Sequence, residues 1–174
     1  MSEEPRLLCE GKHLRFLSRE GWEYVEHRTA PEAAMIVAIT PEERLVLVEE
    51  FRPPLSAPVI SLPTGLIGDE GPEDAVEAAR RELREETGYE APRLERLARG
   101  PGSAGQSSEM VTFFLARDVA LAGEQAEHDR ERIRVHLVAL GQVRDWTARA
   151  EKSGSAIDPK IFAGLYLAER SKEP

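Results

Sequence analysis

Short segments rich in β-branched and aromatic residues, either continuously apolar or alternating with polar positions, recur along the chain. Where turn residues bound them, such segments predict strands. The predicted strands span residues 14–18, 22–27, 34–39, 44–51, 59–62, 110–116 and 133–139. Glu20-Gly21 and residues 40–43 separate neighbouring strands and predict hairpins. Residues 100–108 are small and polar, so we expect a flexible loop that either only connects or contacts a substrate.

Three segments predict helices. In the first, Pro72 occupies the first helical position, Glu73 and Asp74 lie where the helix dipole favours acids, and Gly88 ends the helix. The other two predicted helices span residues 141–152 and 158–170, the second with Asp158 as its N-cap. Strands mixed with helices in this order indicate an α+β fold.

The first predicted helix carries acidic side chains at the edge of its apolar face. With about 100° per residue and Ala75 at zero, the apolar stripe with Ala79 and Leu83 lies within about 100°. Glu82 and Glu86 fall at about 340° and 20°, so both carboxylates are expected to point inward. Other charged residues of this segment fit a solvated, ion-paired face instead, namely Glu73, Glu77, Arg80 and Arg84.

Two inward carboxylates one turn apart are unfavourable unless a cation compensates them. Glu85 lies beside Glu82 on the wheel and can reach the same cation, and Arg81 can hold Glu85 from four residues away. Oxygen ligands without histidine or cysteine favour Mg²⁺ or Mn²⁺ over Zn²⁺. The spacing therefore predicts a divalent metal site.

Composition agrees with one compact enzyme domain, since 174 residues with 41% hydrophobic content can form a core of ordinary size. A net charge of −9 disfavours nucleic acid as a partner. Cys9 is alone, which fits a reducing compartment. No signal peptide or long apolar run is recognised, so we expect a cytoplasmic protein without membrane contact.

The segment from Glu73 to Tyr89 resembles the signature box of the Nudix hydrolases. The matching positions are Glu73, Arg81, Glu82, Leu83, Glu85, Glu86, Gly88 and Tyr89. The family pattern opens with a glycine where this chain has Ile67; if Gly65 takes that role, the loop carries two extra residues. The resemblance implies an α/β/α sandwich with a mixed central sheet over residues 31–174. It also implies a small N-terminal β subdomain over residues 1–30 that can serve in dimerisation.

Three features outside the box resemble the branch of this family that acts on ADP-ribose and related nucleoside diphosphate sugars. They are the strand ending in Arg52 with the following Pro63-Thr64-Gly65, the loop that ends in Ser108-Glu109, and the acidic segment 127–135. One departure is Ser61, at a position where many members carry a glutamate.

The resemblance implies roles for individual residues. The metal ligands would be Glu82, Glu85, Glu86, Glu131 and the carbonyl of Thr64. Substrate contacts would come from Arg52, Glu109 and, from a partner subunit, Arg28. Catalytic roles would fall to Glu85, Arg81, Asp129 and Glu131, with Glu131 favoured for the metal and Asp129 for the base.

Several of these residues also have plainer interpretations. Asp129 and Glu131, with Glu127 as a further candidate, can equally be solvated acids paired with neighbouring arginines. Arg28 can be a surface residue at a strand end. Trp22 can stack on a base, although a lone tryptophan that begins an amphipathic strand is more often part of the core.

The expected activity is metal-dependent hydrolysis of the pyrophosphate bond of ADP-ribose or a related nucleoside diphosphate sugar. The products would be a nucleoside monophosphate and a sugar phosphate, with Mg²⁺ or Mn²⁺ as cofactor. Alternatives are a nucleoside triphosphate pyrophosphohydrolase, a catalytically silent nucleotide-sugar sensor and a structural cation site. A homodimer is expected from the family, whose N-terminal strands often exchange between subunits.

Overall fold

The computed structural model describes residues 4–69, 71–126 and 133–171, which form an α+β fold. All seven predicted strands are present, with ends shifted by at most two residues. They are β2 (Leu14–Arg19), β3 (Trp22–His27), β4 (Glu32–Ile39), β5 (Arg44–Arg52), β6 (Ala57–Ser61), β10 (Met110–Arg117) and β12 (Arg134–Ala139). The hairpin between β2 and β3 turns at Glu20 and Gly21, both with positive φ. The hairpin between β4 and β5 turns at residues 40–43, as predicted.

Further strands were not predicted because their sequences lack a clear alternation. They are β1 (Arg6–Glu10), β7 (Thr64–Ile67), β8 (Tyr89–Glu90), β9 (Leu94–Pro101), β11 (Ala120–Leu121) and β13 (Ala156–Ile157). The strand β9 includes Gly100 and Pro101, which corrects the expectation that the loop begins at residue 100. As an edge strand, β9 pairs only with β10 and tolerates this polar sequence.

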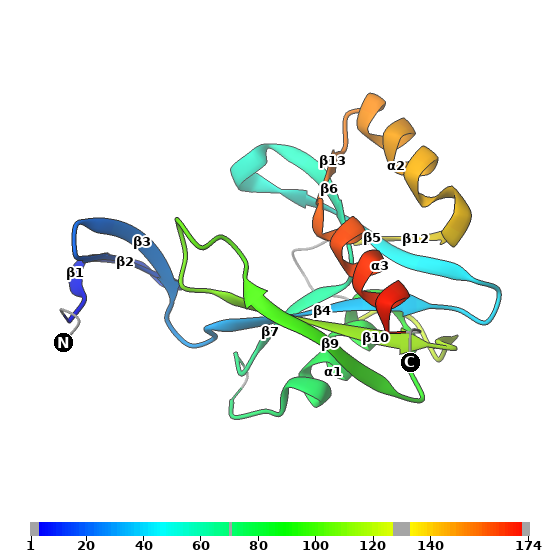
Figure 1. The fold of residues 1–174 in the computed structure, drawn as a ribbon, viewed down its shortest axis with the longest axis horizontal. Coiled ribbons are helices and arrows are strands. Elements are labelled where there is room, and N and C mark those ends of the chain that lie inside the picture. The colour runs from blue at the N-terminus through cyan, green and yellow to red at the C-terminus, as the bar shows by residue number, and fades with distance from the viewer. Residues whose placement is uncertain (1–3, 70, 127–132, 172–174) are drawn as a thin grey trace.

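A mixed sheet forms the centre of the molecule (Figure 1). Its strands follow the order β13-β6-β5-β4-β10-β9, while β12 pairs with β5 and β7 pairs with β4. The pairs β4–β10 and β6–β13 are parallel, and the other pairs of this sheet are antiparallel. Because β7 pairs with β4 from Thr64 to Ile67, the segment before the first helix is fixed on the central strand.

Helices cover both faces of this sheet. On one face, α1 (Ala75–Thr87) buries Ala79 and Leu83 against β4 and β10. On the other face, α2 (Val143–Lys152) and α3 (Lys160–Arg170) pack over a second core cluster that contains Val37 and Leu47. The short helices η1 (Pro53–Leu55) and η2 (Leu140–Gln142) complete the helical elements of the described chain. The arrangement is the expected sandwich.

The start of α1 differs from the prediction. The helix begins at Ala75, and Asp74 is the N-cap, whose carboxylate accepts a hydrogen bond of 2.9 Å from the Val76 N–H. Pro72 therefore precedes the helix instead of opening it. The helix starts after Asp74 because the carboxylate of this residue accepts a hydrogen bond from a free N–H of the first turn. Proline has no side-chain acceptor and cannot cap the helix in this way. Gly88 ends the helix in a left-handed conformation, as predicted.

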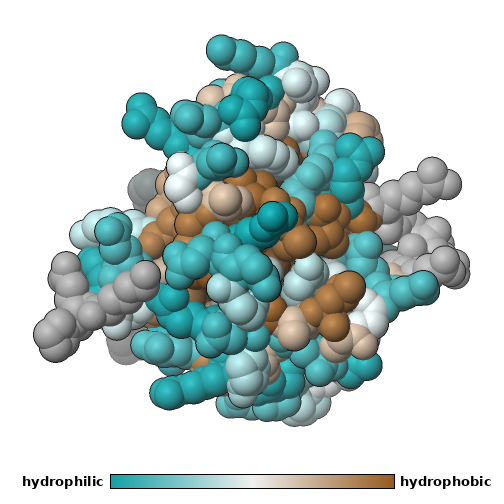
Figure 2. Space-filling model, turned by 90° about the vertical axis from the view of Figure 1, so that its right-hand side faces the viewer, coloured by the Kyte–Doolittle hydropathy of each residue, from teal (hydrophilic) through white to brown (hydrophobic). Residues whose placement is uncertain are grey.

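At the start of α3, the N-cap is Pro159 and not Asp158, one residue later than predicted. The Asp158 carboxylate still accepts a hydrogen bond of 2.9 Å from the N–H of Lys160, the first residue of the helix. Among the described residues, no helix is long and apolar enough to cross a membrane. The face turned toward the viewer in Figure 2 shows apolar surface between hydrophilic regions.

The strands β1, β2 and β3 form a separate antiparallel sheet, the N-terminal arm (Arg6–His27), which projects from the body (Figure 1). Leu17 is buried in the arm, whereas Trp22 is 66% exposed. The core interpretation of Trp22 is therefore wrong in the single chain, because this sheet is too small to cover both of its faces. The arm is hydrogen-bonded to the body where Val25 pairs with the loop at Gln106 and Ser108.

Candidate active site

The side chain of Glu86 points into the protein from the last turn of α1. Its Oε2 accepts a hydrogen bond of 2.9 Å from the backbone N–H of Thr64. Burial raises the pKa of Glu86 to about 8 against the opposing effect of this hydrogen bond, and the charges of Glu82 and Glu50 add to the rise. The inward orientation inferred from the helical wheel is confirmed for this residue.

Glu82 lies one turn earlier, directly against β7. A Cβ atom at Gly65 would lie 1.8 Å from its Cδ, so only glycine at position 65 lets this carboxylate occupy its place. Burial raises the pKa of Glu82, although the neighbouring Arg81 opposes the shift. The close contact supports the reading of Gly65 as the glycine that opens the signature box.

Arg81 is the hub of an ion-pair network beside these two carboxylates. Its guanidinium lies 2.8 Å from Glu82, 3.2 Å from Glu85 and 3.2 Å from Glu73, with Asp69 at 3.4 Å. Hydrogen bonding to Glu73 is the main cause of the raised pKa of Arg81. Glu73 thus belongs to this network, which corrects its assignment to the solvated face. Arg81 positions the acidic side chains of the helix.

A further carboxylate, which the sequence analysis did not single out, belongs to the site. Glu50 is only 8% exposed and lies 2.6 Å from the guanidinium of Arg52. It follows Val46 and Val48 at every second position of β5, so it continues a buried face of the strand. This alternation is the sequence signal that could have predicted a buried Glu50. It is hard to recognise because the preceding residues of β5 are apolar on both faces of the strand.

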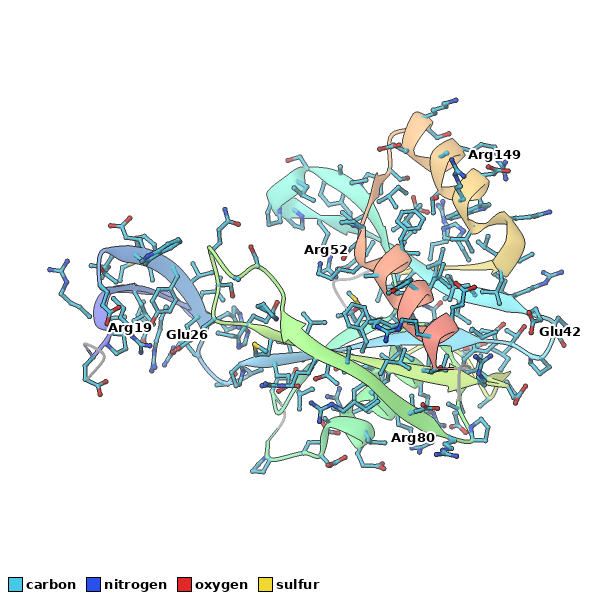
Figure 3. The ribbon with its side chains drawn as sticks, viewed as in Figure 1. Arg19, Glu26, Glu42, Arg52, Arg80 and Arg149 are labelled. Carbon is cyan, nitrogen blue, oxygen red and sulfur yellow. The ribbon has the colours of Figure 1, made fainter. Side chains whose placement is uncertain are left out.

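A cavity of about 380 Å³ opens beside β7, the strand that contacts the carboxylates of Glu82 and Glu86. Arg52 and Glu109, both predicted to contact substrate, line it together with Thr64 and Gly65. Figure 3 shows Arg52 near the centre of the molecule, close to the start of α3. The structure therefore brings Arg52 of β5 and Glu109, which precedes β10, to the strand β7. The carboxylates of Glu86 and Glu82 on α1 lie against Thr64 and Gly65 of the same strand.

The donor set fits a hard divalent cation. Glu82, Glu85 and Glu86 offer carboxylate oxygens. The hydroxyl of Thr64 donates to the Leu62 carbonyl at 2.8 Å, so the carbonyl of Thr64, and not its hydroxyl, is the group that could bind a cation. In the described part of the chain, no three histidine, cysteine or acidic side chains converge tightly enough to hold a metal in their present rotamers. The carboxylates of Glu82 and Glu85 form ion pairs with the guanidinium of Arg81. They must therefore turn away from Arg81 to bind one metal ion together.

The remaining predicted residues lie apart from this cluster. Arg28 hydrogen-bonds to the carbonyls of Gly11 and Lys12 and lies 3.5 Å from Glu10, all within the arm or its turn. In the single chain it does not line the cavity. Glu26 of β3, two residues before Arg28, lies on the arm in Figure 3.

The acidic candidates Glu127, Asp129 and Glu131 lie outside the described residues. The residues that flank them contact the end of α1. The N–H of Ala126 donates to the Glu85 carbonyl at 3.0 Å, and the side-chain amide of Gln125 donates to the carbonyls of Glu86 and Ile133.

Comparison with known proteins agrees with this geometry. The NUDIX domain model matches residues 29–158, and the chain therefore belongs to this family. An ADP-ribose pyrophosphatase from Bacillus subtilis is 35% identical over 63% of this chain and 56% of its own length. The ADP-sugar pyrophosphatase of Mus musculus is 29% identical over 99% of this chain and 88% of its own.

A solved structure described as an ADP compounds hydrolase shares the fold, with a TM-score of 0.73. Its sequence is 21% identical, and the match covers 98% of this chain and 92% of that one. The Nudix-type sandwich with a small N-terminal sheet is thereby confirmed. The matched part of the chain spans little more than half the length of the Bacillus relative.

Proposed function

We propose that this protein hydrolyses the pyrophosphate bond of ADP-ribose or a related nucleoside diphosphate sugar in a metal-dependent reaction. The products are a nucleoside monophosphate and a sugar phosphate. One observation carries the proposal: the partly buried carboxylates of Glu82 and Glu86 lie against Thr64 and Gly65, at the wall of a cavity that Arg52 also lines. Cation ligands and a phosphate-binding guanidinium thus meet at one place.

The metal ligands in this proposal are Glu82, Glu85, Glu86, Glu131 and the carbonyl of Thr64. A bound Mg²⁺ or Mn²⁺ supplies charge neutralisation at the phosphates and a more acidic water. Arg52 pairs with diphosphate oxygens, because a guanidinium matches their geometry and keeps its charge. Its ion pair with Glu50 holds it in the cavity wall. Asp129 or Glu131 accepts the proton of the attacking water.

The names of the relatives support the substrate class. Two of them are pyrophosphatases of ADP-ribose or ADP-sugars, and the cavity has room for part of such a molecule. The acidic net charge of −9 repels a diphosphate, which makes Arg52 and the cation more necessary. We further propose that residues 1–30 form a dimerisation element that brings Arg28 to the partner's substrate, and that the enzyme works in the cytoplasm.

A substrate panel tests this function. ADP-ribose, GDP-mannose, UDP-glucose, CDP-choline, diadenosine compounds and dGTP are incubated with the protein and Mg²⁺, and phosphate-monoester products are measured. The expected result is fastest release from ADP-ribose or another nucleotide sugar, and none after EDTA.

Other outcomes contradict the proposal. Faster hydrolysis of dGTP would select the triphosphate pyrophosphohydrolase. Binding of a nucleotide sugar without product would select the sensor. A Tm raised by Mg²⁺ but unaffected by any diphosphate would select the structural cation site.

A further inference from the structure

Two charged side chains at the start of α3 line the same cavity and have no role in the activity proposed above. The Nζ of Lys160 lies 3.2 and 3.1 Å from the two carboxylate oxygens of Asp158. Both residues share the cavity with Arg52 and Thr64. Asp158 and Lys160 lie at the start of α3, whereas the proposed metal ligands come from α1 and β7.

The backbone fixes this pair in place. The Asp158 N–H donates to the Ile60 carbonyl at 2.9 Å, which continues the pairing of β13 with β6. The carboxylate also accepts from the Lys160 N–H at 2.9 Å. A helix cap needs only the carboxylate. The ammonium group of Lys160 pairs with that carboxylate and lies with it in the wall of the cavity.

The surroundings of the pair are largely apolar. Ala33, Met35, Val59, Leu66 and Val111 line much of the rest of the cavity. The side chain of Asp158 is 16% exposed and that of Lys160 is 37% exposed, so a ligand can still reach both. A carboxylate that accepts and an ammonium that donates, set in an apolar cavity, match the vicinal hydroxyl groups of a sugar.

We propose that Asp158 and Lys160 bind the hydroxyl groups of the sugar beyond the diphosphate and so select sugar-bearing substrates. This inference rests on the proposed function. With the diphosphate between the metal ligands and Arg52, the attached group extends into the cavity toward α3. A group without hydroxyls leaves the pair without new hydrogen bonds, and a site built for such bonds discriminates strongly against that ligand.

The test compares two substrates that share the ADP moiety, ADP-ribose and the butyl ester of ADP. The variants are Asp158→Asn, which can still cap α3, and Lys160→Met. Lys152→Met, at an exposed position of α2, removes the same charge elsewhere and is the control. We expect kcat/KM for ADP-ribose to fall about 10- to 100-fold in both cavity variants, mainly through KM. The value for the butyl ester should stay unchanged, and the control should match the wild type with both substrates.

An equal loss on both substrates, or no loss on either, would overturn the selection of sugars. Calorimetric Kd values with Ca²⁺ are measured in parallel. If the wild type hydrolyses neither compound but binds ADP-ribose, the hydrolytic function fails while the same comparison of Kd values still decides the role of the pair. If the wild type neither hydrolyses nor binds ADP-ribose, both proposals are rejected.

Discussion

At the scale of single residues, Glu86 determines whether the site favours a cation. Burial near Glu82 and Glu50 disfavours its ionised form, and the hydrogen bond from the Thr64 N–H compensates only part of that cost. A divalent cation at the proposed site would compensate the remainder, because it would attract the carboxylates of Glu82 and Glu86 at once. Removal of this carboxylate should therefore harm metal-dependent turnover much more than folding.

Glu86→Gln is expected to reduce kcat by about 100-fold or more. Losing a metal ligand should cost more than losing a residue that only hydrogen-bonds to a ligand, which typically costs about 10- to 100-fold. The amide oxygen can still accept from the Thr64 N–H, so the metal-free Tm should be unchanged or higher. Glu77→Gln, on the exposed side of the same helix, is the control and should keep full activity. A Glu86→Gln enzyme with wild-type kcat would remove this residue from the site.

Gly65→Ala tests the close contact with Glu82 in another way. The new Cβ would lie 1.8 Å from the Cδ of Glu82, and this flexible side chain must turn away from the cavity wall. We expect the Tm to fall by less than about 4 °C, while activity with Mg²⁺ falls sharply.

Gly164→Ala is the matched control for this substitution. Its Cβ would lie 2.8 Å from core atoms of Leu62 and Val37, so overpacking should cost about 1–3 kcal/mol of stability. The folded variant should remain active. Equal activity losses in the two alanine variants, measured per folded molecule, would argue against a special role of Glu82.

The residue pattern predicted Glu82 and Glu86 because helical periodicity alone turns them inward. It could not identify Glu50 or the N–H of Thr64, because these contacts arise only when β5 and β7 lie beside the helix. Asp158 was predicted only as a cap. Its place in the cavity depends on the pairing of β13 with β6, and β13 was not predicted.

At the scale of elements, prediction succeeded where apolar residues fill both faces of a strand, as in β4 and β5. It failed for β9, whose edge position lets charged residues alternate irregularly. The start of α1 was placed too early, because Pro72 and Asp74 are both start signals and only tertiary structure shows which one acts. Short strands such as β7 depend on a partner strand and carry little signal of their own.

One polar cluster joins three elements and predicts a pH dependence. Glu49 of β5 lies 2.8 Å from His136 of β12 and accepts a hydrogen bond of 3.1 Å from Ser155, next to β13. Burial acts to raise the pKa of Glu49, but the hydrogen bonds from His136 and Ser155, together with the charge of the nearby Arg134, lower it below the usual 4.5. The stabilisation is therefore fully present above pH 4.5 and is lost as the pH falls through the folded-state pKa.

Glu49→Gln should consequently lower the free energy of unfolding at pH 7 and make its decrease below pH 4.5 less steep than in the wild type. Urea unfolding at a series of pH values measures both effects. Glu95→Gln, at an exposed position of β9, is the control and should reproduce the wild-type curve. Identical slopes for Glu49→Gln and the wild type would show that this cluster does not contribute to acid sensitivity.

At the scale of the whole molecule, the arm is connected to the cavity through residues 102–108. The N–H of Val25 donates to Gln106 at 2.9 Å, and the Ser108 N–H donates back to Val25 at 3.1 Å. The next residue, Glu109, lines the cavity and donates its N–H to the Ser107 hydroxyl at 3.0 Å. The loop therefore links the arm to Glu109, a predicted substrate residue. The sequence had left open whether this loop only connects two strands or contacts the substrate.

The exposed apolar side chains of the arm predict a homodimer. The side chains of Leu7 and Trp22 are 52% and 66% exposed. Leu7 lies opposite Leu17 and Trp22 lies opposite Arg19 in the neighbouring strand. Leu17 and Arg19 are two residues apart, so Leu7 and Trp22 lie on the same face of the sheet. We expect the variant Leu7→Glu with Trp22→Glu to be monomeric in sedimentation velocity, because each glutamate places charge on a surface that must otherwise be covered. In a two-fold dimer each substitution acts twice.

The activity of that variant decides whether the dimer also completes the site. If Arg28 reaches the substrate of the partner subunit, the monomer should show a higher KM for ADP-ribose, and Arg28→Ala should raise KM without dissociating the dimer. Phe162→Glu with Tyr166→Glu, on the exposed face of α3, adds the same charge elsewhere and should leave both mass and KM unchanged. A wild-type protein that sediments as a monomer at all concentrations would contradict the dimer and the shared site together, since Arg28 binds carbonyls of the arm and does not line the cavity of its own chain.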